Sequence, residues 1–259
     1  MALMAAHKFP YLWGMKQFGL IGKHLSHSFS PSFFADFFQK QGIDAHYTAF
    51  ELQEISDFPE LIKDPIFGGL NVTIPYKTAI IPFLDELDPL AEEIQAVNVV
   101  SFENGKTKGY NTDVYGFQQS IKPFLTFHHE RALIFGTGGA SKAVAYVFKS
   151  LGIDVIFVSQ TESSESNHFT YADVNAHMIA ACKVIVNCTP LGMYPNVDSA
   201  PEMPYDALSA EHLLIDLIYN PEETSFMKQG RANGATSMNG LSMLQHQALK
   251  SWEIWNTPR

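Results

Sequence analysis

The amino-acid sequence predicts an α/β protein built as two lobes, and three observations support this fold class. Short apolar runs that suit buried strands alternate with stretches of helical spacing. The alternation starts again after Asp113. Residues 131–159 then read as strand, glycine-rich turn, helix and strand, which is the pattern of a βαβ unit.

The first lobe opens with a strand that ends at Gly22. A helix is expected next, because Ser30 suits an N-cap, Pro31 the first helical position and Gly42 the stop. The pair Asn104-Gly105 predicts a hairpin turn. In order, the expected elements are a strand at 17–22, a helix at 30–42, a strand at 45–52, a helix at 55–63, a strand at 69–73, helices at 75–84 and 89–95, and a hairpin at 97–111.

The second lobe follows a joint near residues 113–124. After the βαβ unit, the runs KVIVNCTP and HLLIDLIYNP predict further buried strands. The tail GLSMLQHQALKSWEIW predicts a helix with an apolar face. That face is expected to carry Leu241, Leu244, Ala248 and Trp252.

Composition limits the classes of partner and site. With 17 Lys and Arg against 27 Asp and Glu, the net charge is −10 and no basic run occurs, which argues against a nucleic-acid or anionic-membrane surface. No apolar run is long enough to span a bilayer. Cys182 and Cys188 do not suggest a disulfide framework, so a reducing cytoplasm is expected. The ten histidines show no metal-ligand spacing, and no metal is expected.

A second start-like segment begins at Met15 and leads directly into the first strand. Residues 1–14 are therefore expected to be an extension outside the fold, with no signal peptide pattern.

The turn GTGGAS predicts a dinucleotide site. Gly136 permits a tight turn after a strand, and Gly138 lets the backbone approach a pyrophosphate. The helix that follows presents free N–H groups to negative charge. A glycine-rich turn in a domain that binds nothing is the alternative, and the two flanking strands favour the dinucleotide.

Four polar clusters in the first lobe are unusual for a purely structural role. They are SHSFSP, NVTIPYK, AVNVV and GYNTDVYG. Ser28 and Ser30 are expected to point the same way from extended backbone. Each cluster alone can be explained by capping or turn chemistry. Together they predict a polar pocket at strand ends that faces the nucleotide-binding lobe.

These motifs resemble the shikimate dehydrogenase family. The serine motif HSxSP matches residues 27–31, NVTxPxK matches 71–77, AVN matches 96–98 and GxNTDxxG matches 109–116. In the second lobe the resemblance continues through GTGGAS, NCTPLGM, DLIYNPEET and GLSMLQHQA, in family order. It implies a substrate-binding lobe at 15–112, completed by the C-terminal helix at 241–259, and a Rossmann-type NAD(P)-binding lobe at 113–240.

The resemblance implies NADP(H)-dependent, reversible reduction of 3-dehydroshikimate to shikimate, a step toward chorismate and the aromatic amino acids. Lys77 and Asp113 are the implied catalytic pair, with Lys77 as the principal acid/base. Asp113 would orient Lys77, and a proton relay through Asp113 stays open as an alternative. The implied substrate-binding residues are Ser28, Ser30, Asn71, Thr73, Asn98, Tyr219 and Gln247.

The same resemblance implies a set of cofactor-binding residues: Gly136, Gly138, Gly139, Ala140, Ser159, Gln160, Thr161, Thr189, Pro190, Leu191, Met193, Ile218 and Gly240. NADP-using members carry an arginine where this chain has Gln160. An amide cannot neutralise a ribose phosphate, so NADP is expected with weak discrimination against NAD. No acid stands at the strand end either; Glu162 lies further on.

Two other readings stay open. A quinate/shikimate dehydrogenase using NAD would share these motifs. A noncatalytic ligand-sensing relative would have no need of both Lys77 and Asp113. The sequence is compatible with a monomer or a homodimer and does not choose between them.

Overall fold

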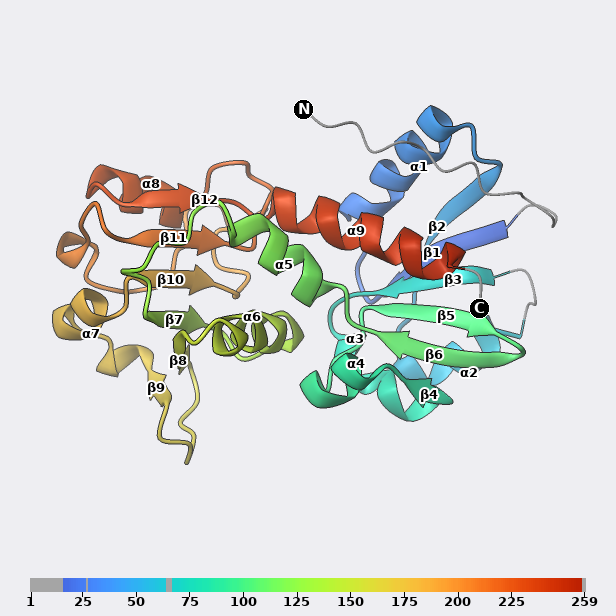
Figure 1. Ribbon diagram of the computed structural model, residues 1–259, viewed down its shortest axis with the longest axis horizontal. Coiled ribbons are helices and arrows are strands. Elements are labelled where there is room, and N and C mark those ends of the chain that lie inside the picture. Colours follow the sequence, from blue (N-terminus) through green and yellow to red (C-terminus); the bar gives the residue numbers. More distant parts are fainter. Residues whose placement is uncertain (1–15, 27, 64–66, 258–259) are drawn as a thin grey trace.

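The computed structural model describes residues 16–26, 28–63 and 67–257 of the chain. The expected extension at 1–14 lies outside the described residues, as does His27 of the serine motif. Figure 1 shows two α/β lobes, each built around its own sheet, with α5 and α9 between them. The α/β, two-lobed fold class is confirmed.

The sheet of the first lobe has, within the described residues, six strands in the order β2-β1-β3-β5-β6-β4. β1 pairs in parallel with β2 and β3, while β5 joins β3 and β6 in antiparallel fashion. Its strands are β1 Lys16–Gly22, β2 Ala45–Glu51, β3 Phe67–Val72, β4 Glu86–Leu87, β5 Val99–Glu103 and β6 Lys106–Tyr110. The hairpin turn is confirmed, because Asn104 and Gly105 both have positive φ angles.

The sheet of the second lobe is parallel throughout, in the order β12-β11-β10-β7-β8-β9. This is the doubly wound dinucleotide-binding order, with its switch point between β7 and β10. Ligands bind at such a point, outside the carboxyl ends of the strands. The strands are β7 Arg131–Phe135, β8 Asp154–Ser159, β9 His168–Thr170, β10 Val184–Asn187, β11 Leu213–Asp216 and β12 Thr236–Met238.

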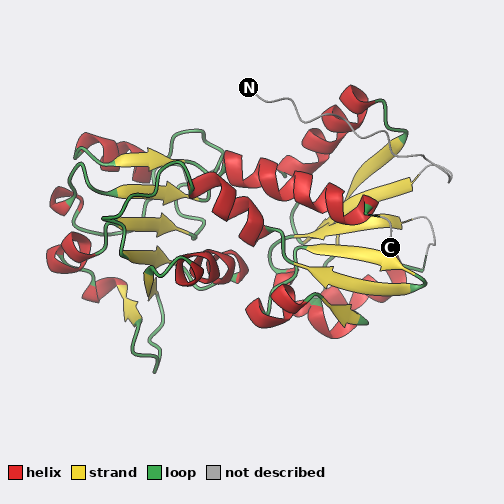
Figure 2. Ribbon diagram, viewed as in Figure 1, coloured by secondary structure: helices red, strands yellow, loops and turns green. Residues whose placement is uncertain are grey.

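The helices lie on the faces and between the sheets, as Figure 2 shows. The α-helices are α1 Phe29–Gln41, α2 Phe58–Leu61, α3 Tyr76–Ala79, α4 Pro89–Ile94, α5 Asp113–Ile121, α6 Gly139–Ser150, α7 Ala176–Ala181, α8 Ser225–Ala232 and α9 Leu241–Asn256. Short 3₁₀ turns occupy Ile55–Asp57, Ile81–Phe83, Tyr171–Asp173 and Tyr205–Ala207. α9 packs along α5 and also contacts β3 and β5, so the end of the chain returns to the first lobe.

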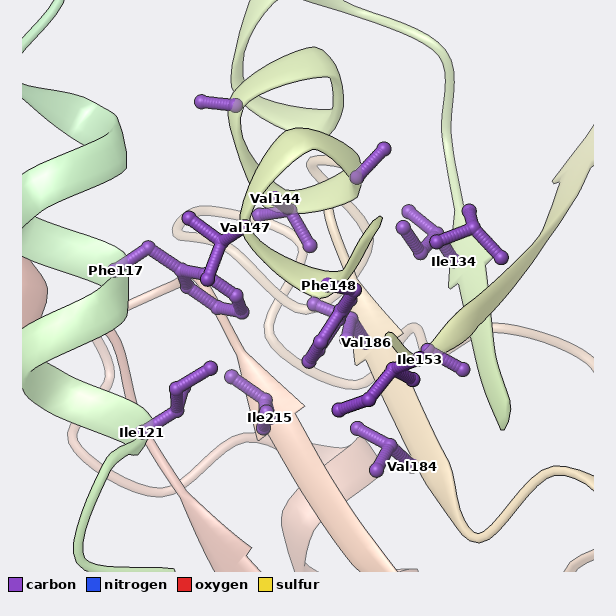
Figure 3. Packing of buried hydrophobic residues seen from close by; sticks show 14 of the residues in the cluster. Phe117, Ile121, Ile134, Val144, Val147, Phe148, Ile153, Val184, Val186 and Ile215 are labelled. Carbon is purple, nitrogen blue, oxygen red and sulfur yellow. The ribbon is translucent and has the colours of Figure 1, made fainter. Parts of the chain in front are cut away.

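The core of the second lobe lies between its sheet, α5 and α6. Figure 3 shows aliphatic side chains of β7, β10 and β11 beneath the two helices. The rings of Phe117 on α5 and Phe148 on α6 meet edge-on, with centroids 5.3 Å apart. This packing holds α5, which begins at Asp113, against the lobe that carries the glycine turn.

Three local predictions were wrong. α1 begins at Phe29 with Ser28 in the N-cap position, so Ser30 lies inside the first helical turn and not in extended backbone. The helix expected at 75–84 is split into α3 and a 3₁₀ turn, because Pro82 cannot donate the backbone hydrogen bond that a continuous helix needs. The third was wrong only in part: Ala248 is buried and Leu244 and Trp252 are partly buried as expected, but Leu241 is exposed. The buried face of α9 also carries Met243, Gln247, Ser251 and Trp255, since α9 packs between lobes whose polar site it completes.

Candidate active site

A lysine and an aspartate meet where the two lobes adjoin. Lys77 Nζ lies 2.7 Å from Asp113 Oδ2, and the two side chains are only 15% and 6% exposed. Lys77 is on α3, directly after β3, and Asp113 is the first residue of α5. The pair therefore joins the end of the first sheet to the helix that leads into the second lobe.

Two hydrogen bonds hold the start of the short helix that carries Lys77. The Tyr76 hydroxyl donates to Leu52 O at 2.6 Å, which anchors α3 to the segment after β2. Val97 N donates to Lys77 O at 2.7 Å, which fixes the backbone of the lysine itself. The backbone that carries the Lys77 side chain is therefore fixed by hydrogen bonds.

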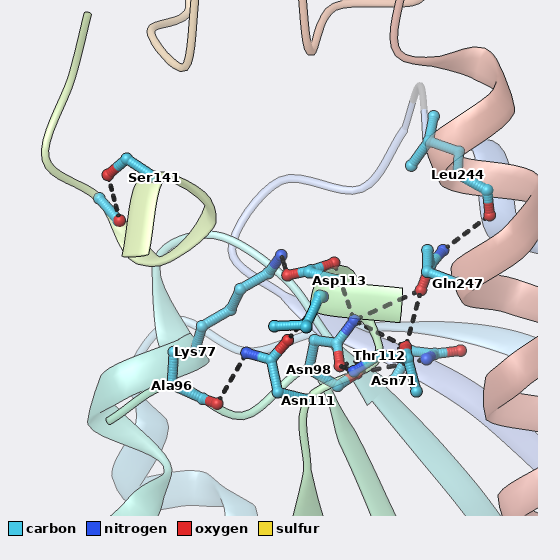
Figure 4. Close-up of polar contacts among 12 residues, drawn as sticks. Asn71, Lys77, Ala96, Asn98, Asn111, Thr112, Asp113, Ser141, Leu244 and Gln247 are labelled. Carbon is cyan, nitrogen blue, oxygen red and sulfur yellow. Dashed lines mark hydrogen bonds and ion pairs between the residues drawn. The ribbon is translucent and has the colours of Figure 1, made fainter. Parts of the chain in front are cut away.

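Asn98 holds the other side of the aspartate. Its Nδ2 lies 2.9 Å from Asp113 Oδ1 and 3.4 Å from Gln247 Oε1, and its Oδ1 accepts from Thr112 N at 2.7 Å. Both oxygens of Asp113 therefore have donors, one from Lys77 and one from Asn98 (Figure 4). Asn98 is 2% exposed, so this amide is a fixed part of the site.

Asn71 extends the same network across the sheet. Its Nδ2 donates to Ser251 Oγ at 3.0 Å and to Asn98 O at 3.2 Å. Its Oδ1 accepts from the Tyr47 hydroxyl at 2.7 Å. Of the expected site residues, the structure thus brings together Lys77, Asn71, Asn98, Asp113 and Gln247.

A second group of hydroxyls gathers at the start of α1. Ser30 shares a hydrogen bond with Tyr47, which connects it to the Asn71 network. The ring of Tyr219 lies 5.8 Å from that of Phe29, and burial raises the pKa of the Tyr219 hydroxyl, partly offset by a hydrogen bond with the Phe29 backbone. Ser28 stands beside them in the N-cap position.

Thr73 lies at the end of β3, half buried, where its methyl group approaches Gly22. Its backbone N–H donates to Ile21 O at 2.8 Å. It therefore stands near Asn71 in the chain without a place in the hydrogen-bonded network described above.

Sequence reasoning missed three members of the network: Tyr47, Thr112 and Ser251. Ser251 follows Gln247 by one helical turn, so its position on the same face of α9 could have been predicted. Thr112 lies within the NTD motif. Tyr47 had no local signal, because its contact with Asn71 depends on β2 and β3 flanking β1 in the sheet.

The glycine turn lies against the lysine. A β-carbon placed on Gly139 would be 3.2 Å from Lys77 Cβ, whereas one on Gly138 would meet nothing within 4 Å. Gly136 has φ +101°, a conformation that side chains rarely adopt, and it lies close to the loop after β10. The turn thus offers open space at the N-terminus of α6, where free N–H groups suit a pyrophosphate.

The remaining expected cofactor residues lie in loops on both sides of this turn. Ser159 is the last residue of β8, Gln160 and Thr161 follow it, and the Ser159 hydroxyl donates to Thr161 O at 2.6 Å. On the other side, Thr189, Pro190, Leu191 and Met193 follow β10, while Ile218 and Gly240 are joined by a 3.0 Å backbone hydrogen bond. Gln160 and Thr161 are exposed.

Two surface hollows touch the edge of the network, one through Thr112 and the other through Tyr47. One of about 370 Å³ borders Asn111 and Lys250, and one of about 460 Å³ lies between α1 and β2. The site is better located by its convergent polar groups, since neither hollow is lined by Lys77 or Asp113. Among the described residues there is no group of three or more His, Cys, Asp or Glu placed to hold a metal, and no helix long and apolar enough to cross a membrane.

A parallel sheet of this order, a glycine turn at its switch point and a buried lysine–aspartate pair beside that turn define a two-lobed oxidoreductase of the Rossmann-type dinucleotide-binding class. Residues 20–100 match the family model described as the shikimate dehydrogenase substrate binding domain. The chain belongs to the shikimate dehydrogenase family.

Three relatives illustrate the match. The NADP(+) shikimate dehydrogenase of Methanosphaera stadtmanae is 37% identical over 255 residues, covering 92% of this chain and 90% of the relative. The structure of shikimate 5-dehydrogenase from Thermus thermophilus with NADP(H) and shikimate has a TM-score of 0.83 at 29% identity, covering 93% and 94% of the two chains. Quinate dehydrogenase from Corynebacterium glutamicum with NAD also has a TM-score of 0.83, at 28% identity and the same coverage.

Proposed function

We propose that this protein is an NADP-dependent shikimate dehydrogenase, which reversibly reduces 3-dehydroshikimate to shikimate. The observation that carries the proposal is the buried Lys77–Asp113 pair, which lies against the glycine turn in a chain of this family. The two structures named above are of a shikimate dehydrogenase with NADP(H) and shikimate and of a quinate dehydrogenase with NAD, and the network of amides and hydroxyls suits hydroxylated six-membered-ring carboxylic acids of this kind.

We propose that one lobe binds the substrate and the other binds the cofactor. We assign residues 15–112 to substrate binding, together with the C-terminal helix at 241–259, and residues 113–240 to the cofactor. The packing of α9 on β3 and β5 supports this division, as does the place of Gln247 beside Asn98.

The residues fit NADP. The open space at Gly138 and the free N–H groups of α6 suit the pyrophosphate, with Gly136, Gly139 and Ala140 completing the turn. We assign Ser159, Gln160 and Thr161 to the adenosine ribose, and the loops after β10 and β11 to the nicotinamide end. When bound there, the reduced cofactor supplies the hydride for the ketone carbon.

Lys77 supplies the proton. As the ketone is reduced, negative charge develops on its oxygen, and an ammonium group beside it stabilises that charge and donates a proton. Asp113 holds Lys77 in place, and both of its oxygens already accept hydrogen bonds, one from Lys77 and one from Asn98. This occupancy favours Lys77 over Asp113 as the group that moves the proton. In the reverse direction the neutral amine accepts the proton.

Hydroxyl groups would bind the substrate carboxylate, with Ser28, Ser30 and Tyr219 as its donors. Asn71, Thr73, Asn98 and Gln247 would surround the ring hydroxyls. Asn71 and Asn98 already use their amide protons within the protein, so their main contribution is to fix the site. Asn98 holds Asp113 and Gln247, and Asn71 holds Ser251 and the backbone of Asn98.

The test is a spectrophotometric assay of shikimate and quinate, each with NADP and NAD. The proposal expects turnover of shikimate with NADP, and slower turnover of quinate. Higher kcat/KM for quinate with NAD would assign the protein to the quinate activity instead, and no turnover with saturable binding of shikimate would indicate a ligand sensor. Light scattering of the purified protein would decide between a monomer and a homodimer, and we propose the cytoplasm as its compartment because both thiols are free.

A further inference from the structure

A buried carboxylate outside the proposed catalytic pair joins two loops of the second lobe, the one after β10 and the one after β11. Asp216 is the last residue of β11, and it is fully buried. It lies beside Asn187, the last residue of β10, in the register of the two parallel strands. A fully buried acid is uncommon unless its oxygens are paired, so its partners indicate what it holds.

Every partner of Asp216 is a donor. Asn187 Nδ2 lies 3.1 Å from Oδ1, Ile218 N lies 3.0 Å from Oδ1, and the Thr224 hydroxyl lies 2.6 Å from Oδ2. Burial raises the pKa of Asp216 to about 6, so the group is mostly ionised at pH 7 and can only accept. The titratable groups that face it, Cys188 and Tyr205, have pKa values that burial raises, and both are neutral there.

The contacts of Asn187 continue into the loop after β10. Its Nδ2 also donates to Leu191 O at 3.0 Å, and its Oδ1 accepts from Thr189 N and from the Thr189 hydroxyl. The Thr189 hydroxyl in turn accepts from Leu191 N at 3.2 Å. One amide therefore sets the path of 187–191, and Asp216 fixes the orientation of that amide.

The contacts of Ile218 and Thr224 set the loop after β11. Ile218 N donates to Asp216 and Ile218 O accepts from Gly240 N, so both peptide bonds of this residue are held. Thr224 caps α8 through Met227 N at 3.3 Å. Tyr219 follows Ile218 directly and reaches Phe29 of the first lobe.

We infer that Asp216 is a positioning residue, whose three accepted hydrogen bonds place the nicotinamide-side loops 187–193 and 217–219 and, through Ile218, the Tyr219 side chain. It touches none of the reacting groups assigned above and acts through Asn187 and Ile218. The inference rests on the proposed function only for the identity of the ligands that these loops bind.

The decisive variant is Asp216→Asn, with Asp206→Asn as the matched control, because Asp206 is an exposed carboxylate of the same lobe. An asparagine can keep the two bonds at one oxygen but presents an NH2 group to Thr224, so the bond that the Thr224 hydroxyl donates to Oδ2 is lost. The loss of one bond to a charged group is expected to weaken NADPH binding, measured by its fluorescence, and to raise KM for shikimate, each about tenfold. Asp206→Asn should change neither.

Thermal unfolding separates positioning from simple loss of fold. Removing a buried charge relieves its desolvation, so the Tm of Asp216→Asn is expected to stay within a few degrees of the wild type. Weakened NADPH and shikimate binding at an unchanged Tm supports the inference. Unchanged Kd and KM, with only the active fraction or Tm reduced, would show that Asp216 serves the fold alone and would overturn it.

Amide hydrogen exchange tests the positioning role of Asp216 independently of the proposed enzyme activity. In the ligand-free protein, Asp216→Asn should raise amide exchange at 187–193 and 217–224 at least tenfold, while exchange in β1 to β3 stays unchanged. Unchanged exchange in those loops would overturn the inference even in an active enzyme. If the wild type reduced no 3-dehydroshikimate, the proposed function would fail while this result still stood.

Discussion

The substitution Lys77→Met removes the ammonium of the proposed acid and keeps the apolar stem of the side chain. The stem matters, because a β-carbon on Gly139 would lie only 3.2 Å from Lys77 Cβ and 3.4 Å from Cδ. Methionine keeps the stem beyond Cβ that lies against the glycine turn, whereas alanine would keep only Cβ. The variant therefore tests the charge and the proton alone.

The expected loss follows from what the ammonium does. A general acid contributes about 10²–10⁴ in rate, and a donor to a developing oxyanion about 10²–10³. One group supplies both effects and they overlap, so kcat should fall about 10³-fold, which corresponds to about 4 kcal/mol of activation free energy. Asp113 keeps its bond from Asn98, so the free energy of unfolding should drop only about 2 kcal/mol, below the range for a fully buried pair.

The assay is steady-state oxidation of shikimate with NADP, together with a fluorescence titration of NADPH. The Kd for NADPH should change less than about twofold, since the cofactor turn is intact. Lys63→Met is the matched control, because Lys63 pairs with Glu60 on the exposed surface of the same lobe, and it should leave kcat unchanged. A Lys77→Met enzyme with kcat within tenfold of the wild type would refute the assignment of Lys77 as the acid.

Three further predictions test specificity, packing and pH dependence. Gln160→Arg should raise the preference for NADP over NAD about 10–100-fold in the ratio of kcat/KM values, because a guanidinium can pair with the ribose phosphate. Gly69→Ala should lower the free energy of unfolding by about 2–3 kcal/mol in urea titrations, since its β-carbon would lie 2.1 Å from Trp255 Nε1, which donates to Val100 O. Burial lowers the pKa of His212 below its ordinary value of 6.5, so as pH falls below 6.5 the unfolded chain is protonated at this histidine before the folded protein. The free energy of unfolding therefore decreases as pH falls below 6.5. His212→Gln should reduce the slope of this free energy against pH by up to about 1.4 kcal/mol per pH unit.

Each of these has an outcome that contradicts it. A wild type already strongly selective for NADP, with no gain from Gln160→Arg, would show that another group reads the phosphate. Gly69→Ala with wild-type stability would mean that Trp255 repacks at no cost. For the pH prediction, His177→Gln is the control because His177 is exposed, and a slope equal in the His212 and His177 variants would rule out His212 as a source.

Much of the fold could be predicted because its signals are local. The glycine turn between two apolar strands, the Asn104-Gly105 hairpin and the αL stop at Gly42 depend on neighbouring residues, and all three are present. The start of α1 shows the limit of such signals. Ser28 and Ser30 are both good capping residues, and the helix begins at Phe29, where α1 packs against β2.

The candidate site was predicted in its parts and not in its connections. Family motifs identified Lys77, Asn98 and Asp113, because each stands in a recognisable stretch. The place of Tyr47 could not be predicted, since the contact with Asn71 depends on which strands flank β1. The buried face of α9 was misjudged for a related reason: a helix that completes a polar site buries polar groups, which hydrophobic spacing does not reveal.

By itself the sequence predicted the α/β class of the chain and the dinucleotide turn, because these follow from residue type and short-range spacing. The absence of an arginine at Gln160 and the proposed pair of Lys77 and Asp113 came from the resemblance of its motifs to the family. Only the tertiary structure decided that Lys77 and Asp113 lie 2.7 Å apart, that Gly139 lies against the lysine, and that Asp216 joins the cofactor-side loops. Those relations arise from strand order and lobe packing, which bring together residues far apart in the chain.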